Sequence, residues 1–275
     1  MIIMNKIGID LYAIMPLHEY DDNVKVLMKR ALASVPKDMV VGISTTTEIK
    51  EKYEREIEEI ANEVGAEIGI VGWEGSSDFC TLVNKMADTA HEWFTILEYD
   101  DEFTPNWLDN VKKYVEYNPD CSVFLPLEEL IDYNTNKFIG YGNEAPWATS
   151  FSNEIGYIDN ECLQQYFDFY LTGGVFNVKD WRNVGGLKPS IKLTFWYEFL
   201  LRLTNNNKKV FVMPKLCYKH YVNRPNSLYD QYGNTISEKE SNWWYELSRQ
   251  EYFFKEDRKK VYEDSVVFNH KGDEE

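Results

Sequence analysis

Short apolar runs alternate with amphipathic patterns along the first half of this chain. Apolar residues that recur every three or four positions predict a helix, whereas a short apolar run closed by Pro, Gly or Ser predicts a buried strand. The predicted strands are 6–15, 38–44, 66–71 and 93–99, and the predicted helices are 23–34, 48–64, 77–90 and 107–116. Strands that alternate with helices are typical of a mostly parallel sheet, so we expect an α/β fold.

The second half has a weaker pattern. Residues 130–156 are polar and aromatic without a clear period, which predicts a long irregular excursion over the molecule. The other predicted elements are strands at 124–127, 171–176, 209–213 and 217–221, and helices at 195–204 and 238–255, the last followed by an acidic tail. A length of 275 residues favours one large domain with an appendage. We therefore expect a domain at 1–221 and a C-terminal loop and helical extension at 222–275.

Composition narrows the class of protein. No apolar run approaches the roughly 20 residues that span a bilayer, and residues 1–16 lack the basic start and cleavage site of a secretory leader. We therefore expect a cytoplasmic protein without membrane insertion. The four cysteines form no CxxC pair, which predicts reduced, structural thiols.

Charge is unevenly distributed along the chain. The net charge is −17, yet the segment 181–229 contains nine basic residues and a single acid, Glu198. This segment is either a solvated basic face or an anion site for phosphates. The acidic remainder argues against wholesale wrapping by nucleic acid or anionic lipid.

A crowd of carboxylates follows the predicted strand 93–99. Asp101 and Glu102 are explained as the acidic start of a helix, but Glu98 and Asp100 alternate around Tyr99 at the strand's own end. Carboxylates in such a position repel one another unless a cation offsets them, and ligands bind at this edge of open α/β sheets. Oxygen ligands favour Mg²⁺ or Mn²⁺ bridging to phosphates, so we predict a divalent metal site here.

The order of these features resembles the GT-A glycosyltransferases, and within them family 2, over roughly residues 6–227. The motifs that carry the resemblance are the strand 9–16, Asn84, Glu98-Tyr99-Asp100-Asp101 with Pro105-Asn106-Trp107-Leu108, Gly173-Gly174-Val175-Phe176, Val184-Gly185-Gly186-Leu187, Leu201-Arg202-Leu203, and Lys209-Val210 leading to Pro214 and His220. The resemblance implies a Rossmann-like, mixed but mostly parallel sheet flanked by helices. It also implies a nucleotide-sugar half at about 1–105 and an acceptor half at about 106–221.

The resemblance also implies roles for individual residues. Asp100, Glu98 and His220 match the metal ligands, although a lone histidine is as often structural. The residues that match donor contacts are Ala13, Met15, Pro16, Ser44, Thr45, Thr46, Asn84, Tyr99, Asp101, Gly173, Gly174, Lys219 and Arg224. The paired glycines fit either a close ligand or a tight turn. Trp196 matches an acceptor contact, and UDP is the expected nucleotide.

The chain departs from the family pattern twice. The second strand ends in Ser44-Thr45-Thr46-Thr47 where the family has an aspartate that holds the base, so the nucleobase stays open. The helix that carries the general base opens with Phe195 and Trp196 in place of an acidic pair. Glu198 is the nearest carboxylate and our candidate base, with an ion pair to Arg202 as the equal alternative. Glu144 or Asp159 would serve if Glu198 points away, and the stereochemistry stays open.

The acceptor is the least constrained part of this interpretation. Length and the aromatic C-terminal extension are loosely similar to T-even-type phage enzymes that glycosylate glucosyl-hydroxymethylcytosine in DNA, which would place the chain in the host cytoplasm. The alternative acceptor is a cell-surface glycan precursor. A non-catalytic nucleotide-sugar binding module is the rival from another class. A nucleotidyltransferase is disfavoured because Met15-Pro16-Leu17-His18-Glu19 offers no glycine-rich basic loop.

Overall fold

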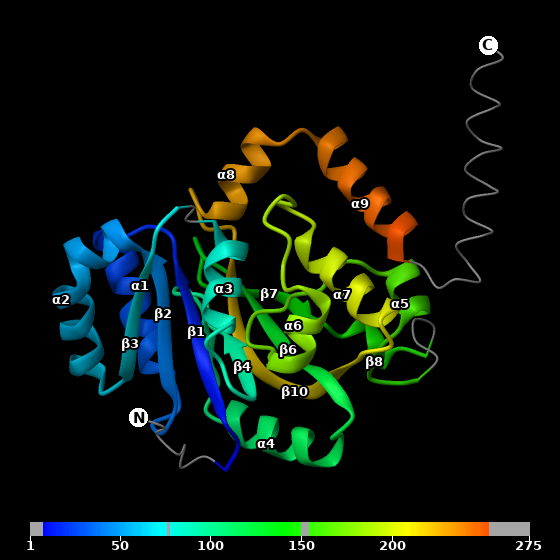
Figure 1. Cartoon of the computed structure of the whole chain (residues 1–275), viewed down its shortest axis with the longest axis horizontal. Helices are drawn as coiled ribbons and strands as arrows, with labels where there is room; N and C mark the ends of the chain where they lie inside the picture. Colours follow the sequence, from blue (N-terminus) through cyan, green and yellow to red (C-terminus); the bar gives the residue numbers. More distant parts are fainter. Residues whose placement is uncertain (1–7, 76–77, 150–153, 253–275) are drawn as a thin grey trace.

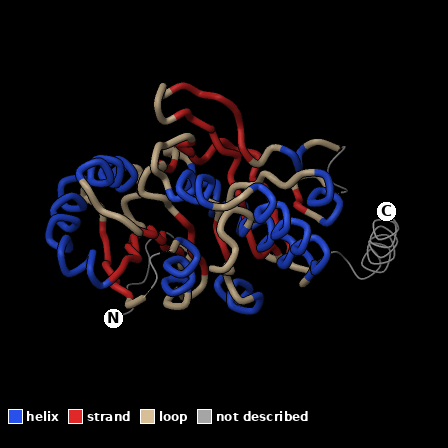
Figure 2. The backbone as a smooth tube through the Cα atoms, turned by 90° about the horizontal axis from the view of Figure 1, so that it is seen from above, coloured by secondary structure: helices blue, strands red, loops and turns tan. Residues whose placement is uncertain are grey.

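The computed structural model describes residues 8–75, 78–149 and 154–252. In this part of the chain ten strands form one mixed sheet, in which the path β3-β2-β1-β4-β9-β6-β10-β5 is joined by β7 on β6 and β8 on β10. β1 pairs in parallel with β2 and β4, and β2 in parallel with β3. Helices lie on both sides of the strands (Figures 1 and 2). The expected α/β fold with a mostly parallel, helix-flanked sheet is confirmed.

The elements have the following bounds. The strands are β1 (Leu11–Leu17), β2 (Val40–Thr46), β3 (Glu67–Trp73), β4 (Trp93–Ile96), β5 (Glu102–Phe103), β6 (Cys121–Asp132), β7 (Lys137–Gly142), β8 (Tyr157–Ile158), β9 (Val175–Asn177) and β10 (Lys209–Val222). The helices are α1 (Asp22–Ala33), α2 (Thr47–Val64), α3 (Phe79–Ala87), α4 (Trp107–Tyr117), α5 (Asn160–Gln165), α6 (Val178–Val184), α7 (Phe195–Asn205), α8 (Leu228–Thr235) and α9 (Glu238–Tyr252), with a 3₁₀ turn η1 (Ala145–Trp147).

Local side-chain chemistry sets the helix starts in the first half. Asp21 accepts a hydrogen bond from the backbone of Val24, Thr46 from Ile49, and Asp78 from Thr81. Each of these N-caps satisfies a backbone N–H that has no partner inside its helix. The predicted helices therefore lie where expected, although the predicted starts of strand 6–15 and helix 77–90 lie outside the described residues.

The region 130–156 differs from the expected irregular excursion. β6 continues to Asp132 and turns back into β7, which forms an antiparallel hairpin with it. Asp132 accepts a hydrogen bond from the backbone of Thr135 at 2.8 Å and so closes the turn. The pattern missed this hairpin because it projects beyond the core, with Phe138, Ile139 and Tyr141 more than half exposed.

β10 also differs from expectation, because it continues through Pro214. The register against β6 shifts between Met213 and Leu216, so a bulge takes the proline out of the hydrogen-bonded ladder. The two predicted strands 209–213 and 217–221 are therefore one strand. Its far end carries His220 to the same edge of the sheet as the end of β4.

The C-terminal extension contains two helices where one was predicted. α8 and α9 follow β10 and arch over α7 (Figure 1). Tyr245 of α9 stacks on Tyr197 of α7 with ring centroids 4.5 Å apart and planes 1° from parallel. The predicted helix end at residue 255 lies outside the described residues, as does the acidic tail, and the division of the chain at residue 221 stays a prediction.

The interior agrees with the expectation for the cysteines. All four, Cys80, Cys121, Cys162 and Cys217, are buried free thiols. No helix in the described ranges is long and apolar enough to cross a membrane.

Candidate active site

The acidic segment lies at the carboxyl end of a central strand. β4 ends at Ile96, with β1 on one side and β9 on the other, and Glu98, Asp100 and Asp101 follow it. β5 then pairs antiparallel with β10, which sets Glu102 opposite Lys219. This pairing brings the acidic segment beside residues about 120 positions further along the chain. Such an edge is where open α/β sheets bind ligands.

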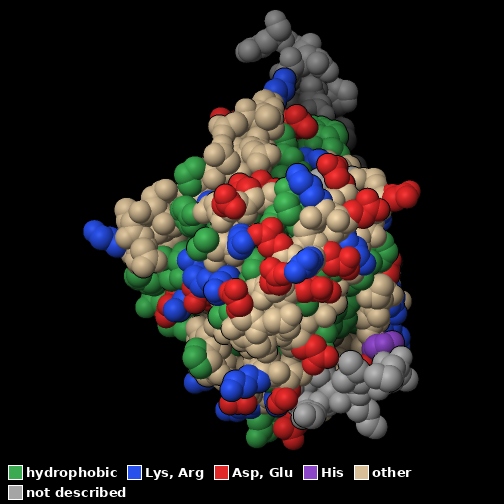
Figure 3. All heavy atoms as spheres, turned by 90° about the vertical axis from the view of Figure 1, so that its left-hand side faces the viewer, with side chains coloured by type: hydrophobic (Ala, Val, Ile, Leu, Met, Phe, Trp, Pro, Cys, Tyr) green, Lys and Arg blue, Asp and Glu red, His purple; other side chains and the backbone are tan. Residues whose placement is uncertain are grey.

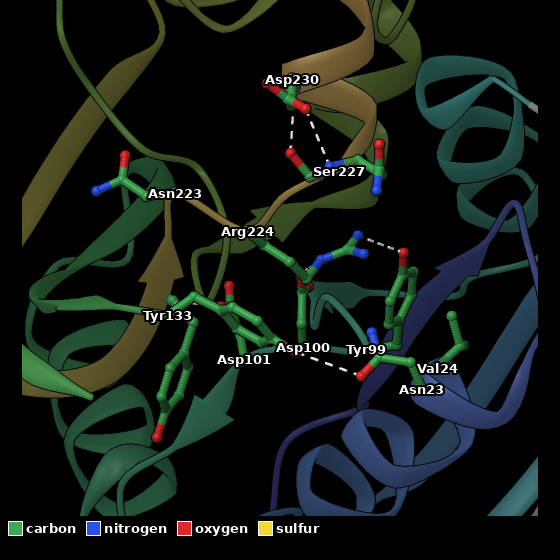
Figure 4. Close-up of polar contacts among 12 residues, drawn as sticks. Asn23, Val24, Tyr99, Asp100, Asp101, Tyr133, Asn223, Arg224, Ser227 and Asp230 are labelled. Carbon is green, nitrogen blue, oxygen red and sulfur yellow. Dashed lines mark hydrogen bonds and ion pairs between the residues drawn. The ribbon is translucent and has the colours of Figure 1, made fainter. Parts of the chain in front are cut away.

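Arg224 holds Asp100. Its Nε donates to Oδ2 of Asp100 at 2.7 Å, and another guanidinium nitrogen donates to the Tyr99 hydroxyl at 2.6 Å (Figure 4). Glu19 lies 3.5 Å from the same guanidinium. Burial and the neighbouring Asp101 raise the pKa of Asp100, and Arg224 opposes that shift. Arg224 is therefore a built-in cationic partner of Asp100.

Asp101 is the partner of His220. The Asp101 carboxylate lies 2.8 Å from Nδ1 of His220 and accepts the backbone N–H of Tyr221 at 2.8 Å. Burial disfavours a charged imidazole, but Asp101, Glu128 and Glu98 outweigh it and raise the pKa of His220 to about 10. A protonated imidazole has no lone pair for a metal, so His220 would have to lose its proton to act as a ligand, and its predicted metal-binding role stays a prediction.

Two further carboxylates face this cluster. Burial, reinforced by Asp101 and Asp100, raises the pKa of Glu98 to about 8. Glu128 of β6, which sequence reasoning missed, is 0% exposed, and neither carboxylate oxygen has a hydrogen-bond partner in the described part of the chain. A carboxylate at the end of the apolar stretch Phe124–Leu127 was the available signal. Burial raises the pKa of Glu128 well above its ordinary value.

The side chains at this edge are of the chemical type that binds a divalent ion. Glu98 and Asp100 are the oxygen donors that Mg²⁺ or Mn²⁺ prefers. Among the described residues, no group of three or more His, Cys, Asp or Glu side chains is arranged to hold an ion. The reason lies in the contacts above, since Arg224 already pairs with Asp100 and His220 with Asp101. An ion could therefore bind Asp100 fully only after Arg224 moves.

The residues predicted to contact the nucleotide lie at the ends of β1 and β2, but most have internal partners. Ala13, Met15 and Pro16 are buried in β1. Ser44 donates its hydroxyl to the Leu82 carbonyl at 2.7 Å, and Thr45 donates to the Leu17 carbonyl at 2.7 Å. These hydroxyls stabilise the fold, while Thr46 caps α2.

Asn84 and the paired glycines also have structural partners. Asn84 bonds both backbone groups of Leu187, at 2.7 and 2.8 Å. Gly173 has φ +68°, and a Cβ there would lie 2.4 Å from the ring of Tyr218. The Tyr218 hydroxyl in turn accepts the backbone N–H of Glu98 at 3.3 Å. The close approach at Gly173 is therefore to Tyr218, which sits beneath the acidic segment.

Glu198 is buried in α7, and Trp196 is partly buried against the core beside it. Glu198 is 1% exposed and is bonded by Arg202 at 2.8 and 2.9 Å and by Lys188 at 2.8 Å. The structure thus shows the ion-pair alternative for Glu198, and its role as base stays a prediction. Trp196 packs edge-on against Phe79. Asp159 caps α5, and Glu144 is exposed at η1.

The basic segment 181–229 is mostly neutralised. Six of its nine basic residues form ion pairs, namely Arg182, Lys188, Arg202, Lys208, Lys209 and Arg224. Charges are mixed elsewhere as well, because acidic and basic side chains are interspersed on the face at the left of Figure 1, where α2 lies (Figure 3). Ion pairs with acidic side chains therefore account for most of the charges of the segment, and both the solvated-face and the phosphate-site interpretations stay predictions.

Solved structures share this fold. S. aureus TarS 1–349 in complex with UDP-GlcNAc matches with TM-score 0.54 and 12% identity, over 80% of this chain and 60% of that chain. Mannosyltransferase PcManGT from Pyrobaculum calidifontis, in complex with GDP-Man and Mn²⁺, matches with TM-score 0.53 and 13% identity, over 79% and 58%. No family model and no curated protein matches the chain. The fold is thus shared with glycosyltransferases, and the chain spans about 60% of the length of these neighbours.

Proposed function

We propose that this chain is a metal-dependent glycosyltransferase that moves a hexose or pentose from a UDP-sugar to an acceptor hydroxyl in the cytoplasm. The observation that carries the proposal is the group at the end of β4, where Glu98 and Asp100 lie beside the cations Arg224 and His220. Fold neighbours with UDP-GlcNAc, or with GDP-Man and Mn²⁺, support it.

Side chains of this chain can stabilise the negative charge that the reaction develops on the leaving group. Breaking the anomeric bond leaves a nucleoside diphosphate with new negative charge, which a bound divalent ion would stabilise as a Lewis acid. Glu98 and Asp100 would hold that ion. Arg224, once released from Asp100, would bind the diphosphate, while His220 keeps a positive charge at the same edge. Lys219 is a further proposed donor contact, whereas the backbone N–H groups of Gly173 and Gly174 already donate to the carbonyls of Ile96 and Leu171.

The acceptor we propose is an already glycosylated one, including glucosylated hydroxymethylcytosine in phage DNA, with a glycan precursor as the alternative. The paired state of most basic residues means that any DNA contact is narrow and salt-sensitive. Radiolabelled sugar transfer to glucosylated phage DNA at rising salt tests this acceptor, and no incorporation even at low salt would discard it.

The experiment for the reaction compares two aspartates. Wild type is incubated with a panel of UDP-sugars and Mn²⁺, and UDP release and UDP affinity are measured. We expect Asp100→Asn to lower Mn²⁺-dependent UDP affinity at least about tenfold, because it removes one anionic ligand. Asp109→Asn, at an exposed position in α4, is the matched control and should behave as wild type. Unchanged Mn²⁺-dependent affinity in Asp100→Asn would refute the metal assignment.

One observation favours a second candidate, a binding module without turnover. The positions of the family's acidic pair hold Phe195 and Trp196, and Glu198 is bound to two cations. Such a module would bind UDP-sugar in a metal-dependent way and release no UDP, with or without acceptor.

A further inference from the structure

The proposed reaction needs a carboxylate that can reach the acceptor hydroxyl. The start of α7 offers none, since Phe195 and Trp196 are apolar there. Glu198 is 1% exposed and is bonded to Arg202 and Lys188. If Glu198 turned toward an acceptor, it would leave Arg202 and Lys188. The buried charges of Glu198 and Arg202 would then be unpaired, which costs free energy. A base must therefore come from another element.

The carboxylates that act electrostatically on His220 are the next candidates. Asp101 is 0% exposed and bound to His220 and to the Tyr221 backbone. Glu128 is 0% exposed, and Glu98 belongs to the proposed metal pair. Asp168 also interacts with His220. It is exposed, and within the described part of the chain its carboxylate has no hydrogen bond or ion pair.

The segment that carries Asp168 is fixed in place on the His220 side. Asn143 is 0% exposed; its side chain donates to the carbonyls of Pro126 at 3.0 Å and Tyr170 at 2.9 Å, and accepts the Tyr170 N–H at 2.9 Å. The Tyr170 ring lies over Gly142, where a Cβ would come within 2.9 Å of it. The same ring packs against His220 with centroids 5.1 Å apart.

Both neighbours of Asp168 in the chain are anchored as well. Phe169 is 3% exposed, and Phe167 packs edge-on against Tyr245 of α9 with centroids 5.0 Å apart. Asp168 therefore has a restrained backbone and a free carboxylate. Although Asp168 is accessible to solvent, the protein around it removes part of its hydration and raises its pKa, which favours proton acceptance, and His220 opposes the shift.

We propose that Asp168 is the general base of the transfer, an inference that rests on the proposed function. The Asp168 carboxylate takes the proton of the acceptor hydroxyl as that oxygen bonds to the anomeric carbon. The bond from the anomeric carbon to the diphosphate oxygen breaks, and its electron pair leaves with the nucleoside diphosphate. Asp168, now a carboxylic acid, returns its proton to solvent. A single displacement of this kind inverts the anomeric configuration.

The test compares three carboxylates with water as the acceptor. UDP release is measured with each UDP-sugar that the wild type turns over, for wild type, Asp168→Asn, Glu198→Gln and Asp109→Asn, the last being an exposed control in α4. We expect Asp168→Asn to lower kcat about 100-fold or more, the range of general base catalysis. Its KM for the donor and its UDP affinity should stay within twofold of wild type. Its melting temperature should be unchanged. Asp109→Asn should turn over like wild type.

The outcomes separate this role from the proposed function. An Asp168→Asn variant with more than a third of wild-type kcat would overturn the role of Asp168 while leaving the transferase intact. A folded Glu198→Gln variant that alone loses kcat would overturn it in favour of Glu198. A wild type that neither binds nor releases UDP would overturn the proposed function and the base together.

Product stereochemistry gives an independent readout. Proton NMR of the sugar first released from a UDP-α-sugar should show the β anomer, which then equilibrates. First release of the α anomer would contradict a single displacement with Asp168 as base.

Discussion

The guanidinium of Arg224 and the carboxylate of Asp100 are both nearly buried, with side chains 6% and 9% exposed. Each satisfies the charge of the other across 124 residues of sequence. A pair of this kind contributes little net stability compared with apolar residues of the same shape, but removing one partner leaves a buried charge alone. The pair therefore stabilises the site in its donor-free form and withholds Asp100 from an ion.

We expect Arg224→Ala to lower the free energy of unfolding by about 3 kcal/mol, the cost of stranding a buried carboxylate. Urea unfolding measures it. Adding Asp100→Asn to Arg224→Ala should recover about 2 kcal/mol, because the stranded charge is then gone. Strictly additive losses in the double variant would show that the two side chains are not coupled.

The loop before β9 shows how an element is fitted to the site. Gly173 lets the Tyr218 ring of β10 lie against the backbone, and the indole of Trp107 in α4 donates to the Gly173 carbonyl at 2.8 Å. Three elements thus meet at one residue. Their packing holds the Tyr218 hydroxyl under Glu98.

Gly173→Ala should therefore destabilise the fold. The new Cβ would meet Tyr218 at 2.4 Å, and φ +68° is a conformation that side chains disfavour. Together these effects cost about 3 kcal/mol. Gly140→Ala in β7 is the matched control, because nothing lies within 4 Å of its Cβ, and it should change stability by less than about 0.5 kcal/mol. Equal urea midpoints for the two variants would contradict this account.

The elements of the first half were predictable because their helices carry a strong apolar period and side-chain caps, as at Asp21 and Thr46. The β6–β7 hairpin was not, because its strands lie half outside the core and lack alternation.

The site was predicted in part. The acidic segment was predictable because its carboxylates follow directly on an apolar strand. The pairing of Asp101 with His220 was not, because it depends on the β5–β10 register, which no local pattern encodes. Asp168 had no signal, because one exposed aspartate in a loop looks like any other.

At the scale of the whole molecule, the net charge of −17 is balanced unevenly. Most surface acids are solvated or paired with lysines, as in the Lys29–Glu63 and Lys209–Asp120 ion pairs. The buried carboxylates of Asp100, Asp101 and Glu128 instead gather around His220 and Arg224, whereas buried Glu198 pairs with Arg202. Protonation of the site is therefore linked to folding of the entire chain.

This linkage predicts how stability depends on pH. The pKa of His220 is raised to about 10, above its unfolded value of 6.5, so its contribution is complete below pH 6.5 and is lost as pH rises toward 10. The pKa of Glu98 is raised to about 8 from 4.5, so the folded state again binds the proton more tightly, and this contribution is lost as pH rises from about 4.5 to 8. Both groups act in one direction. We therefore expect the free energy of unfolding to fall between pH 6 and 10, with a slope on the order of 1 kcal/mol per pH unit for each proton.

Urea unfolding at intervals of pH measures the slope. In His220→Gln the loss above pH 8 should largely disappear, since Asp101 then has no titrating partner, while the part due to Glu98 between pH 6 and 8 should remain. His91→Gln, at an exposed position before β4, is the control and should keep the full wild-type profile. A wild type whose stability rises between pH 8 and 10, or a His220→Gln variant with an unchanged slope, would show that the imidazole is not held as a cation by the acids around it.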